Sequence, residues 1–289
     1  MGESEERLKK PYWLKVKMPN ASRFKQVREV VKGAGVRTVC DASQCPNISD
    51  CWGQGNATFL ILGDVCTRAC KFCAVTSGDP NGMVDEKEPE GVARAVKELG
   101  VKHAVITSVT RDDLEDGGAG MFARTVSQIR SVSPSTRVEL LIPDFNDDPK
   151  ALHTVVSSAP DLLGHNLEVV RGLQTKVRDL KASFAISLKV LRTVKQLSPT
   201  MLTKTSLMLG LGESHAEVLE TMKEARMASV DIMTLGQYLK PRGGSLQVER
   251  YIEPSEFEEL RAEGERLGFR RVLAGPFVRS SYHAHEIFD

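Results

Sequence analysis

Residues 58–73 read TFLILGDVCTRACKFC, and this stretch decides the fold. The apolar run 58–62 ends in a glycine and an aspartate, which is typical of a short buried strand. Three cysteines follow with the spacing C-x3-C-x2-C, namely Cys66, Cys70 and Cys73. Active sites of parallel barrels lie at the carboxyl ends of the strands, so we expect these thiols at a barrel mouth.

The rest of the chain repeats this plan. Short apolar runs alternate with helix-like stretches, which is the pattern of βα units and a parallel sheet, and we count six units. Further strands are predicted at 103–109, 138–142, 162–167, 203–209 and 231–239, with a last extended segment at 271–278. No glycine-rich dinucleotide fingerprint follows the first strand. We therefore predict an α/β protein with a partial (β/α)6 TIM-type barrel.

Helix starts and segment boundaries complete this prediction. Aspartate before proline at 148–149 predicts one helix start, and Ser214 with Glu217 and Ser255 with Glu258 have the spacing of capping boxes. We divide the chain into an N-terminal extension (1–57), the barrel (58–278) and a C-terminal tail (279–289). Both ends are expected to cover the barrel mouth.

The composition is that of a soluble globular protein. The 289 residues are 41% hydrophobic and 27% charged, and 39 basic residues face 38 acidic ones. This balance gives no basic field for nucleic acid or an anionic membrane. No apolar run is long enough to cross a bilayer, and the charged N-terminus lacks a targeting pattern. We expect a cytoplasmic protein.

All six cysteines lie within residues 40–73. Disulfide frameworks belong to short secreted domains, so metal or cluster ligation is the better interpretation. Three thiolates satisfy three irons of a [4Fe–4S] cluster and leave one iron open. Structural zinc would need four ligands, usually as two short pairs. Disulfides and zinc remain the less favoured alternatives.

The C-x3-C-x2-C motif, with an aromatic before its last cysteine, resembles the cluster motif of the radical S-adenosylmethionine (SAM) superfamily. The resemblance implies that SAM chelates the open iron and is cleaved by one electron to a 5′-deoxyadenosyl radical. It also implies that Gly117 and Gly118 approach the methionyl amino group, and that Asn166 and Glu168 contact the ribose or methionine. Polar residues at strand ends, Thr107 and Ser108, are further candidates. From the residues alone, the glycines make a turn and the polar groups cap strands.

A second triad, Cys40, Cys45 and Cys51, has the spacing C-x4-C-x5-C and resembles the auxiliary-cluster motif of lipoyl synthases. Other stretches agree with that family along most of the chain: LKKPYWLKVK, CPNISDCW, TSVTRDDLEDGGAG, HNLE, TKTSLMLGLGE and GPFVRSSYHAHE. No seventh cysteine exists, so the auxiliary [4Fe–4S] cluster needs another fourth ligand or an open iron. The resemblance supplies Ser281 of the RSSY motif, which on residues alone belongs to a solvated tail.

The resemblance implies an activity. The substrate is an octanoyl chain on a lysine of a lipoyl carrier protein or domain, and sulfur from the auxiliary cluster enters at C6 and C8. Each product consumes two SAM molecules and one cluster, so we expect about one turnover per chain without a cluster-repair protein. Flavodoxin or ferredoxin is the expected electron donor. An unactivated C–H bond has no acidic proton, and no acid–base residue is assigned.

Two other functions are open. Other radical enzymes, such as biotin synthase or methylthio-transferring enzymes, share the first triad, but the upstream triad and RSSY argue against them. A non-enzymatic electron relay would not explain a three-cysteine site at a barrel mouth. We assign no metal to His283, His285 and Glu286, because alternate residues of an extended tail need not converge.

Overall fold

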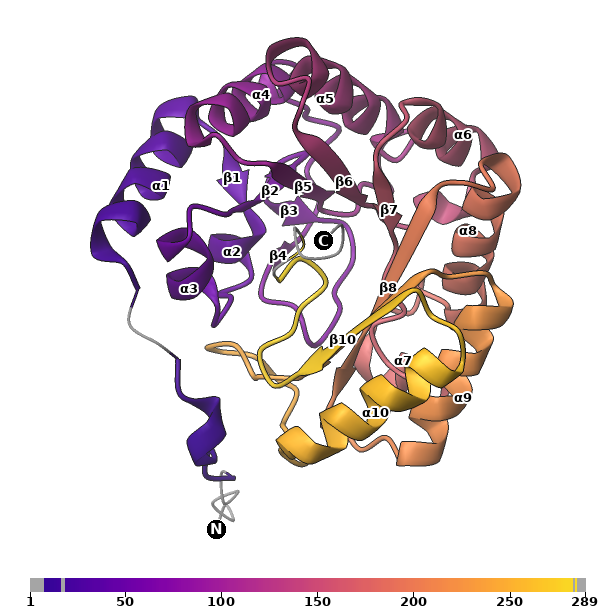
Figure 1. The fold of residues 1–289 in the computed structure, drawn as a ribbon. Helices are drawn as coiled ribbons and strands as arrows, with labels where there is room; N and C mark the ends of the chain where they lie inside the picture. The colour runs from indigo at the N-terminus through magenta and orange to yellow at the C-terminus, as the bar shows by residue number, and fades with distance from the viewer. Residues whose placement is uncertain (1–7, 17–18, 283, 285–289) are drawn as a thin grey trace.

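The computed structural model describes residues 8–16, 19–282 and 284, and the motif residues His283, His285 and Glu286 lie outside them. An eight-stranded sheet dominates the described chain, in the order β1-β2-β5-β6-β7-β8-β9-β10. The strands from β2 to β10 in this order are parallel, while β1 (Arg37–Thr38) is antiparallel to β2. The sheet curves around a central space, with helices on its outside (Figure 1). Within the described ranges β1 and β10 do not pair, so the barrel is partial.

The parallel strands confirm the predicted ones. They are β2 (Thr58–Ile61), β5 (His103–Ser108), β6 (Arg137–Leu141), β7 (Leu162–Gly164), β8 (Leu202–Leu209), β9 (Ile232–Gln237) and β10 (Arg271–Gly275). The main connecting helices are α4 (Glu88–Leu99), α5 (Ala119–Val132), α6 (Pro149–Ser157), α8 (Phe184–Leu197), α9 (His215–Met227) and α10 (Pro254–Arg266). Six βα units followed by a last parallel strand make up the barrel.

Three helix starts test the capping predictions. Asp148 caps α6 by accepting from the backbone of residues 150 and 151, and Ser214 with Glu217 forms the capping box of α9, as predicted. The predicted box at Ser255 is wrong, because α10 begins at Pro254 and Glu253 caps it together with Glu256. Proline fits the first helical position, where its missing N–H costs no hydrogen bond.

The barrel wall is buried on both faces. Every residue of β2 and of β9 is buried, which is typical of parallel strands covered by helices. Inside the barrel, Glu139 on β6 forms an ion pair with Lys204 on β8, although β7 lies between these strands in the sheet. His103 Nε2 lies 3.0 Å from the same carboxylate. A group of buried charged and polar side chains therefore links three strands of the barrel.

Segments before and after the barrel contact it. Helix α1 (Ala21–Ala34) packs against α4, and β1 extends the sheet. The C-terminal segment turns back over the centre of the barrel (Figure 1). It passes so close to β9 that a Cβ on Gly236 would lie 1.9 Å from the carbonyl oxygen of Val278, so only glycine fits there. None of the helices in the described part is long and apolar enough to cross a membrane.

Candidate active site at the barrel mouth

A cavity of about 500 Å³ lies at the carboxyl ends of the parallel strands. All six cysteines line it, together with residues at the ends of β5, β8 and β9, residues that follow β7, and residues of the C-terminal segment. Other predicted site residues on its wall are Thr107, Ser108, Asn166, Glu168 and Ser281. Segments far apart in the sequence therefore meet at the end of the barrel where parallel folds build their sites.

The first triad lies on a loop shaped by a two-stranded parallel sheet, β3 (Val65–Cys66) and β4 (Thr76–Ser77). Inside this loop, the N–H of Cys73 donates to the carbonyl of Cys70 at 3.1 Å. Burial raises the pKa of the Cys70 thiol, and burial with repulsion from the neighbouring thiols raises that of Cys73 to about 11. Metal binding would replace these protons.

The second triad is assembled by two short helices. Cys40 belongs to α2 (Val39–Ala42) and Cys51 to α3 (Ile48–Gly53), with Cys45 between them. Burial raises the pKa of all three thiols, that of Cys40 to about 11. The charges of Cys40 and Cys45 raise the pKa of Cys51 further, so the three sulfurs lie close enough to repel each other when ionised.

The cysteines bear on the choice between disulfides, zinc and an iron–sulfur cluster. All six are free thiols, so the disulfide alternative is set aside. In the described ranges, no group of three or more His, Cys, Asp or Glu side chains is arranged to hold a single metal ion. Three thiols in a triad are one fewer than the four ligands that tetrahedral structural zinc needs, and they match three irons of a four-iron cluster.

The C-terminal segment brings Ser281 to the second triad. Ser281 lines the main cavity with all three cysteines of that triad, and a smaller cavity of about 30 Å³ with Cys51. The amide of Asn47, between Cys45 and Cys51 in the sequence, donates to the carbonyl of Phe277 at 2.5 Å. This bond ties the cysteine segment to the start of the tail.

The predicted SAM contacts at the strand ends include polar atoms without partners. The buried Ser108 Oγ and Asn166 Oδ1 have no hydrogen-bond partner among the described residues, whereas Thr107 donates to the carbonyl of Leu141 at 2.9 Å. Glu168 has a positive φ of 67°, which is strained for glutamate and typical of functional sites. Burial raises the pKa of Glu168. Buried polar groups seek partners, so these atoms suit a polar ligand.

The predicted glycine pair has a different surrounding. Gly117 and Gly118 are not part of the cavity wall and have φ values of 59° and 90° at the start of α5. A Cβ on Gly117 would lie 2.9 Å from Phe145, and one on Gly118 would lie 2.2 Å from Leu62. The structure thus explains both glycines by a tight turn and close packing, and their contact with SAM stays a prediction.

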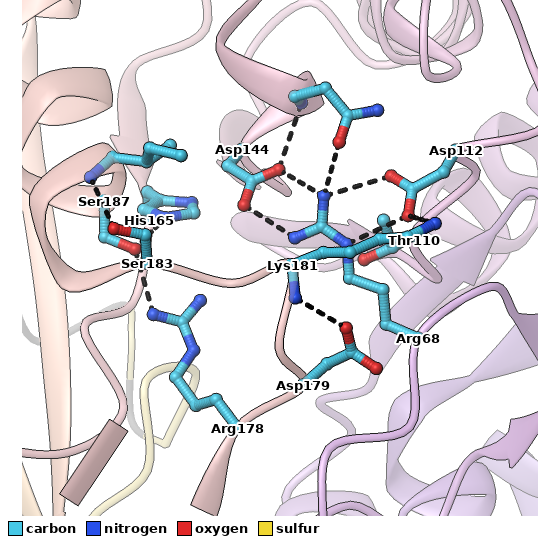
Figure 2. Close-up of polar contacts among 12 residues, drawn as sticks. Arg68, Thr110, Asp112, Asp144, His165, Arg178, Asp179, Lys181, Ser183 and Ser187 are labelled. Carbon is cyan, nitrogen blue, oxygen red and sulfur yellow. Dashed lines mark hydrogen bonds and ion pairs between the residues drawn. The ribbon is translucent and has the colours of Figure 1, made fainter. Parts of the chain in front are cut away.

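Arg68, inside the first triad, is a site residue that the sequence analysis missed. Its guanidinium donates to Asp144 at 2.6 and 2.7 Å, to Asp112 at 3.0 and 3.1 Å, and to Asn146 at 2.9 Å (Figure 2). Burial alone would lower the pKa of Arg68, but hydrogen bonds to the two carboxylates raise it. Asp112 and Asp144 each follow a predicted strand. Their position at the strand ends was the sequence signal that could have indicated a charged site here.

Arg178 is a second missed residue on the cavity wall. Its Nη1 donates to Gln174 at 3.1 Å and to Ser187 at 3.0 Å, while the buried Nε has no partner among the described residues. The positive charge of Arg178 lowers the pKa of Glu168 and so opposes the effect of burial. A buried cation with a free donor suits a ligand carboxylate. A single arginine in a polar stretch gives no such signal in the sequence.

Comparison with known proteins agrees with this geometry. The Radical SAM superfamily matches residues 60–225. The chain is 53% identical over 280 residues to a lipoyl synthase of Pyrobaculum calidifontis, covering 96% of each chain. It is 51% identical over 281 residues to that of Deinococcus radiodurans, covering 97% of this chain and 85% of the relative.

Solved structures show the same fold at low sequence identity. The FeFe-hydrogenase maturase HydG from Carboxydothermus hydrogenoformans superposes with a TM-score of 0.62 at 13% identity, over 93% of this chain and 60% of that one. Methylornithine synthase superposes with a TM-score of 0.57 at 14% identity, over 86% and 74%. By sequence, fold and the cysteines of its barrel mouth, the chain belongs to the lipoyl synthase family of the radical SAM superfamily, whose chemistry uses SAM and an iron–sulfur cluster.

Proposed function

We propose that this chain inserts two sulfur atoms, at C6 and C8, into an octanoyl chain carried on a lysine of a lipoyl carrier protein or domain. In this proposal the chain has an auxiliary-cluster extension (1–57), a radical SAM barrel (58–278) and a ligand-bearing tail (279–289). The observation that carries the proposal is that both cysteine triads and Ser281 line one cavity. A carbon radical made at one site would then be within reach of sulfur held at the other.

The first site would hold a [4Fe–4S] cluster on Cys66, Cys70 and Cys73, with SAM at the iron that lacks a protein ligand. Ser108, Asn166 and Arg178 line the same cavity, and each carries a buried polar atom without a partner among the described residues, so these side chains suit the hydroxyl, amino and carboxylate groups of SAM. When bound, the two clusters and SAM supply a 5′-deoxyadenosyl radical and a source of sulfur.

The second site would hold the sulfur-donating [4Fe–4S] cluster on Cys40, Cys45, Cys51 and Ser281. An alkoxide ligand is displaced from iron more readily than a thiolate, which suits a cluster that is taken apart during the reaction. Arg279 lies two residues before Ser281. Burial lowers the pKa of Arg279, and the negative charge of Cys45 raises it. A guanidinium at this position would offset the negative charge of the thiolates.

Apolar side chains are suited to hold the octanoyl chain and to exclude water. Val109, Ile142 and Met208 line the cavity that both triads also line. A cavity wall that excludes water protects a carbon radical from side reactions. The transfer of alkyl carbons from water into such a cavity is also favourable. No acid–base residue is needed in this account. Flavodoxin or ferredoxin as reductant, a cluster-repair protein and a cytoplasmic location belong to the same proposal.

An anaerobic assay tests the proposal. The chain is reconstituted with iron and sulfide, given SAM, dithionite and an octanoyl-lysyl peptide, and analysed for 5′-deoxyadenosine and peptide mass. We expect both cleaved SAM and a sulfur-bearing peptide. SAM cleavage without sulfur insertion would overturn the lipoyl activity and keep the radical chemistry. An absence of SAM cleavage would leave the electron relay as the better account.

A further inference from the structure

The segment after helix α7 (Gln174–Val177) lies against the loop that carries the first cysteine triad. Asp179 is the centre of this contact, because both its side chain and its backbone bond to the cysteine loop. The family motif does not include Asp179, and the proposed activity assigns it no task. Its position next to Arg178 puts it beside the cavity wall.

Three hydrogen bonds join the two segments. A carboxylate oxygen of Asp179 accepts from the N–H of Ala69 at 2.8 Å. The backbone N–H of Asp179 donates to Cys70 Sγ at 3.3 Å. The N–H of Lys71 donates to the carbonyl of Val177 at 2.9 Å. Three consecutive residues of the loop, with Cys70 in the middle, are thus held by one short segment.

Asp179 is itself held in place. Its second carboxylate oxygen accepts from the N–H of Lys181 at 2.9 Å, and the Lys181 ammonium lies 3.5 Å from Asp112. Asp112 also binds Arg68, which precedes Ala69 in the loop. Figure 2 shows Asp179 below the Arg68 guanidinium, Asp144 and Asp112 above it, and the Lys181 side chain reaching from beside Asp179 to Asp112. Arg68 and Ala69, which lie between Cys66 and Cys70, are therefore both held by hydrogen bonds to other segments.

This arrangement bears on the chemistry of a bound cluster. Hydrogen bonds to the sulfur ligands and nearby charge tune the reduction potential of an iron–sulfur cluster, and outer groups orient the ligands themselves. The N–H of Asp179 is a donor aimed at a ligand sulfur, and its carboxylate is a nearby negative charge. Both groups can influence Cys70, and neither is a ligand of an iron.

We propose that Asp179 is a positioning residue of the first cluster site, which fixes Cys70 through the N–H bond to its sulfur and through the carboxylate bond to Ala69. This inference deepens the proposed function and rests on it for the identity of the cluster. The positioning of the loop is a property of the protein chain alone. It can therefore be measured before any cluster is bound.

The test compares D179A, D179N and a matched control, D161A. Asp161 also accepts from a backbone N–H, that of Val138 at 2.7 Å, and pairs with Arg130, but it lies just before β7, at the amino end of the strands. Loss of Asp161 should therefore lower stability without affecting the cysteine loop. The D179N variant keeps one acceptor oxygen and removes the charge.

The first readout is amide hydrogen exchange in the metal-free protein. We expect Ala69 and Lys71 to exchange about fivefold faster in D179A, less in D179N, and at the wild-type rate in D161A. Unchanged exchange in D179A, with its fold intact by circular dichroism, would overturn the proposal. This result does not depend on the proposed activity.

The second readout is the electron paramagnetic resonance signal and midpoint potential of the cluster after reconstitution. Removal of a negative charge stabilises the reduced cluster, so we expect a less negative potential in D179A and D179N and an unchanged one in D161A. Equal potentials in all variants would overturn the tuning role. If the wild-type protein shows neither SAM cleavage nor sulfur insertion, the proposed function fails, while the exchange result still decides the positioning role.

Discussion

The hydroxyl of Tyr282 donates a hydrogen bond of 3.0 Å to the carboxylate of Asp50, and so joins the C-terminal segment to helix α3. Tyr282 directly follows Ser281, and Asp50 directly precedes Cys51. The bond therefore connects the neighbours of two proposed ligands of the auxiliary cluster. Together with the bond from Asn47 to Phe277, it closes the tail over the second triad.

We predict that Y282F and D50A weaken the auxiliary site alone. One hydrogen bond of this kind contributes about 1 kcal/mol, so Y282F should lose the auxiliary cluster several times faster to a chelator than the wild type, and D50A, which also removes the acceptor of a bond from Gln54, at least as fast. Iron release measured in a background without the first triad isolates this site. The double variant should release iron no faster than the faster of the two single variants. Additive increases in the release rate would show that Tyr282 and Asp50 act separately and would contradict the prediction.

Substitution of Gly236 tests how the tail lies on the barrel. In G236A the new methyl would overlap the carbonyl of Val278, so the tail must shift or the strand must deform. We expect G236A to lose sulfur insertion and to unfold at lower urea concentration. The control is G33A in helix α1, where nothing lies within 4 Å of the added methyl. G33A should stabilise the protein by about 0.5–1 kcal/mol. If G236A and G33A had equal effects on sulfur insertion and on urea unfolding, the close approach of the tail to β9 would not matter.

The buried pair of Glu139 and Lys204 should matter for stability. We expect K204M to cost about 3–5 kcal/mol, since it removes the cation that forms an ion pair with the buried Glu139 carboxylate and leaves His103 as its remaining partner, and E139Q/K204M to cost less. Burial acts to raise the pKa of Glu139, but Lys204 and His103 lower it below its usual 4.5. Its contribution is therefore present above about pH 4.5 and is lost as the pH falls through the lower folded value. Urea titrations from pH 3 to 7 check both effects.

His165 should add a second pH dependence. Its ring nitrogens lie 2.9 Å from the carbonyl of Ile142 and 2.9 Å from the hydroxyl of Ser187, and burial lowers its pKa from 6.5 to about 4. The unfolded chain thus binds a proton between pH 6.5 and 4 that the folded chain excludes. Stability should fall by about 3 kcal/mol as the pH drops through this interval. In H165N this part of the profile should flatten, and an unchanged profile would refute the assignment.

Local sequence patterns predicted the barrel because buried parallel strands have a strong signal. The runs around Phe59, Ile106 and Leu140 are short and mainly apolar and lie between turn residues, and each became a largely buried strand. Helix starts were predictable where a side chain could cap the backbone, as at Asp148. At Ser255 two capping patterns overlapped, and the proline at 254 favoured the earlier start.

The remaining features depend on contacts between distant segments. The edge strand at Arg37 forms only because β2 offers a free edge, and β3 and β4 form because the cysteine loop folds back on itself. The cysteines of the site were predictable from spacing. Arg178 and Asp179 were not, since their importance arises from neighbours far away in sequence, such as Cys70.

The account rests on the claim that one chain holds both the radical source and the sulfur. The most direct measurement is a single-turnover reaction of protein whose auxiliary cluster was reconstituted with ³⁴S-sulfide, with no free sulfide present. We predict a product peptide that carries two ³⁴S atoms, in an amount no greater than the protein. A product with unlabelled sulfur, or many turnovers without a repair protein, would contradict the claim.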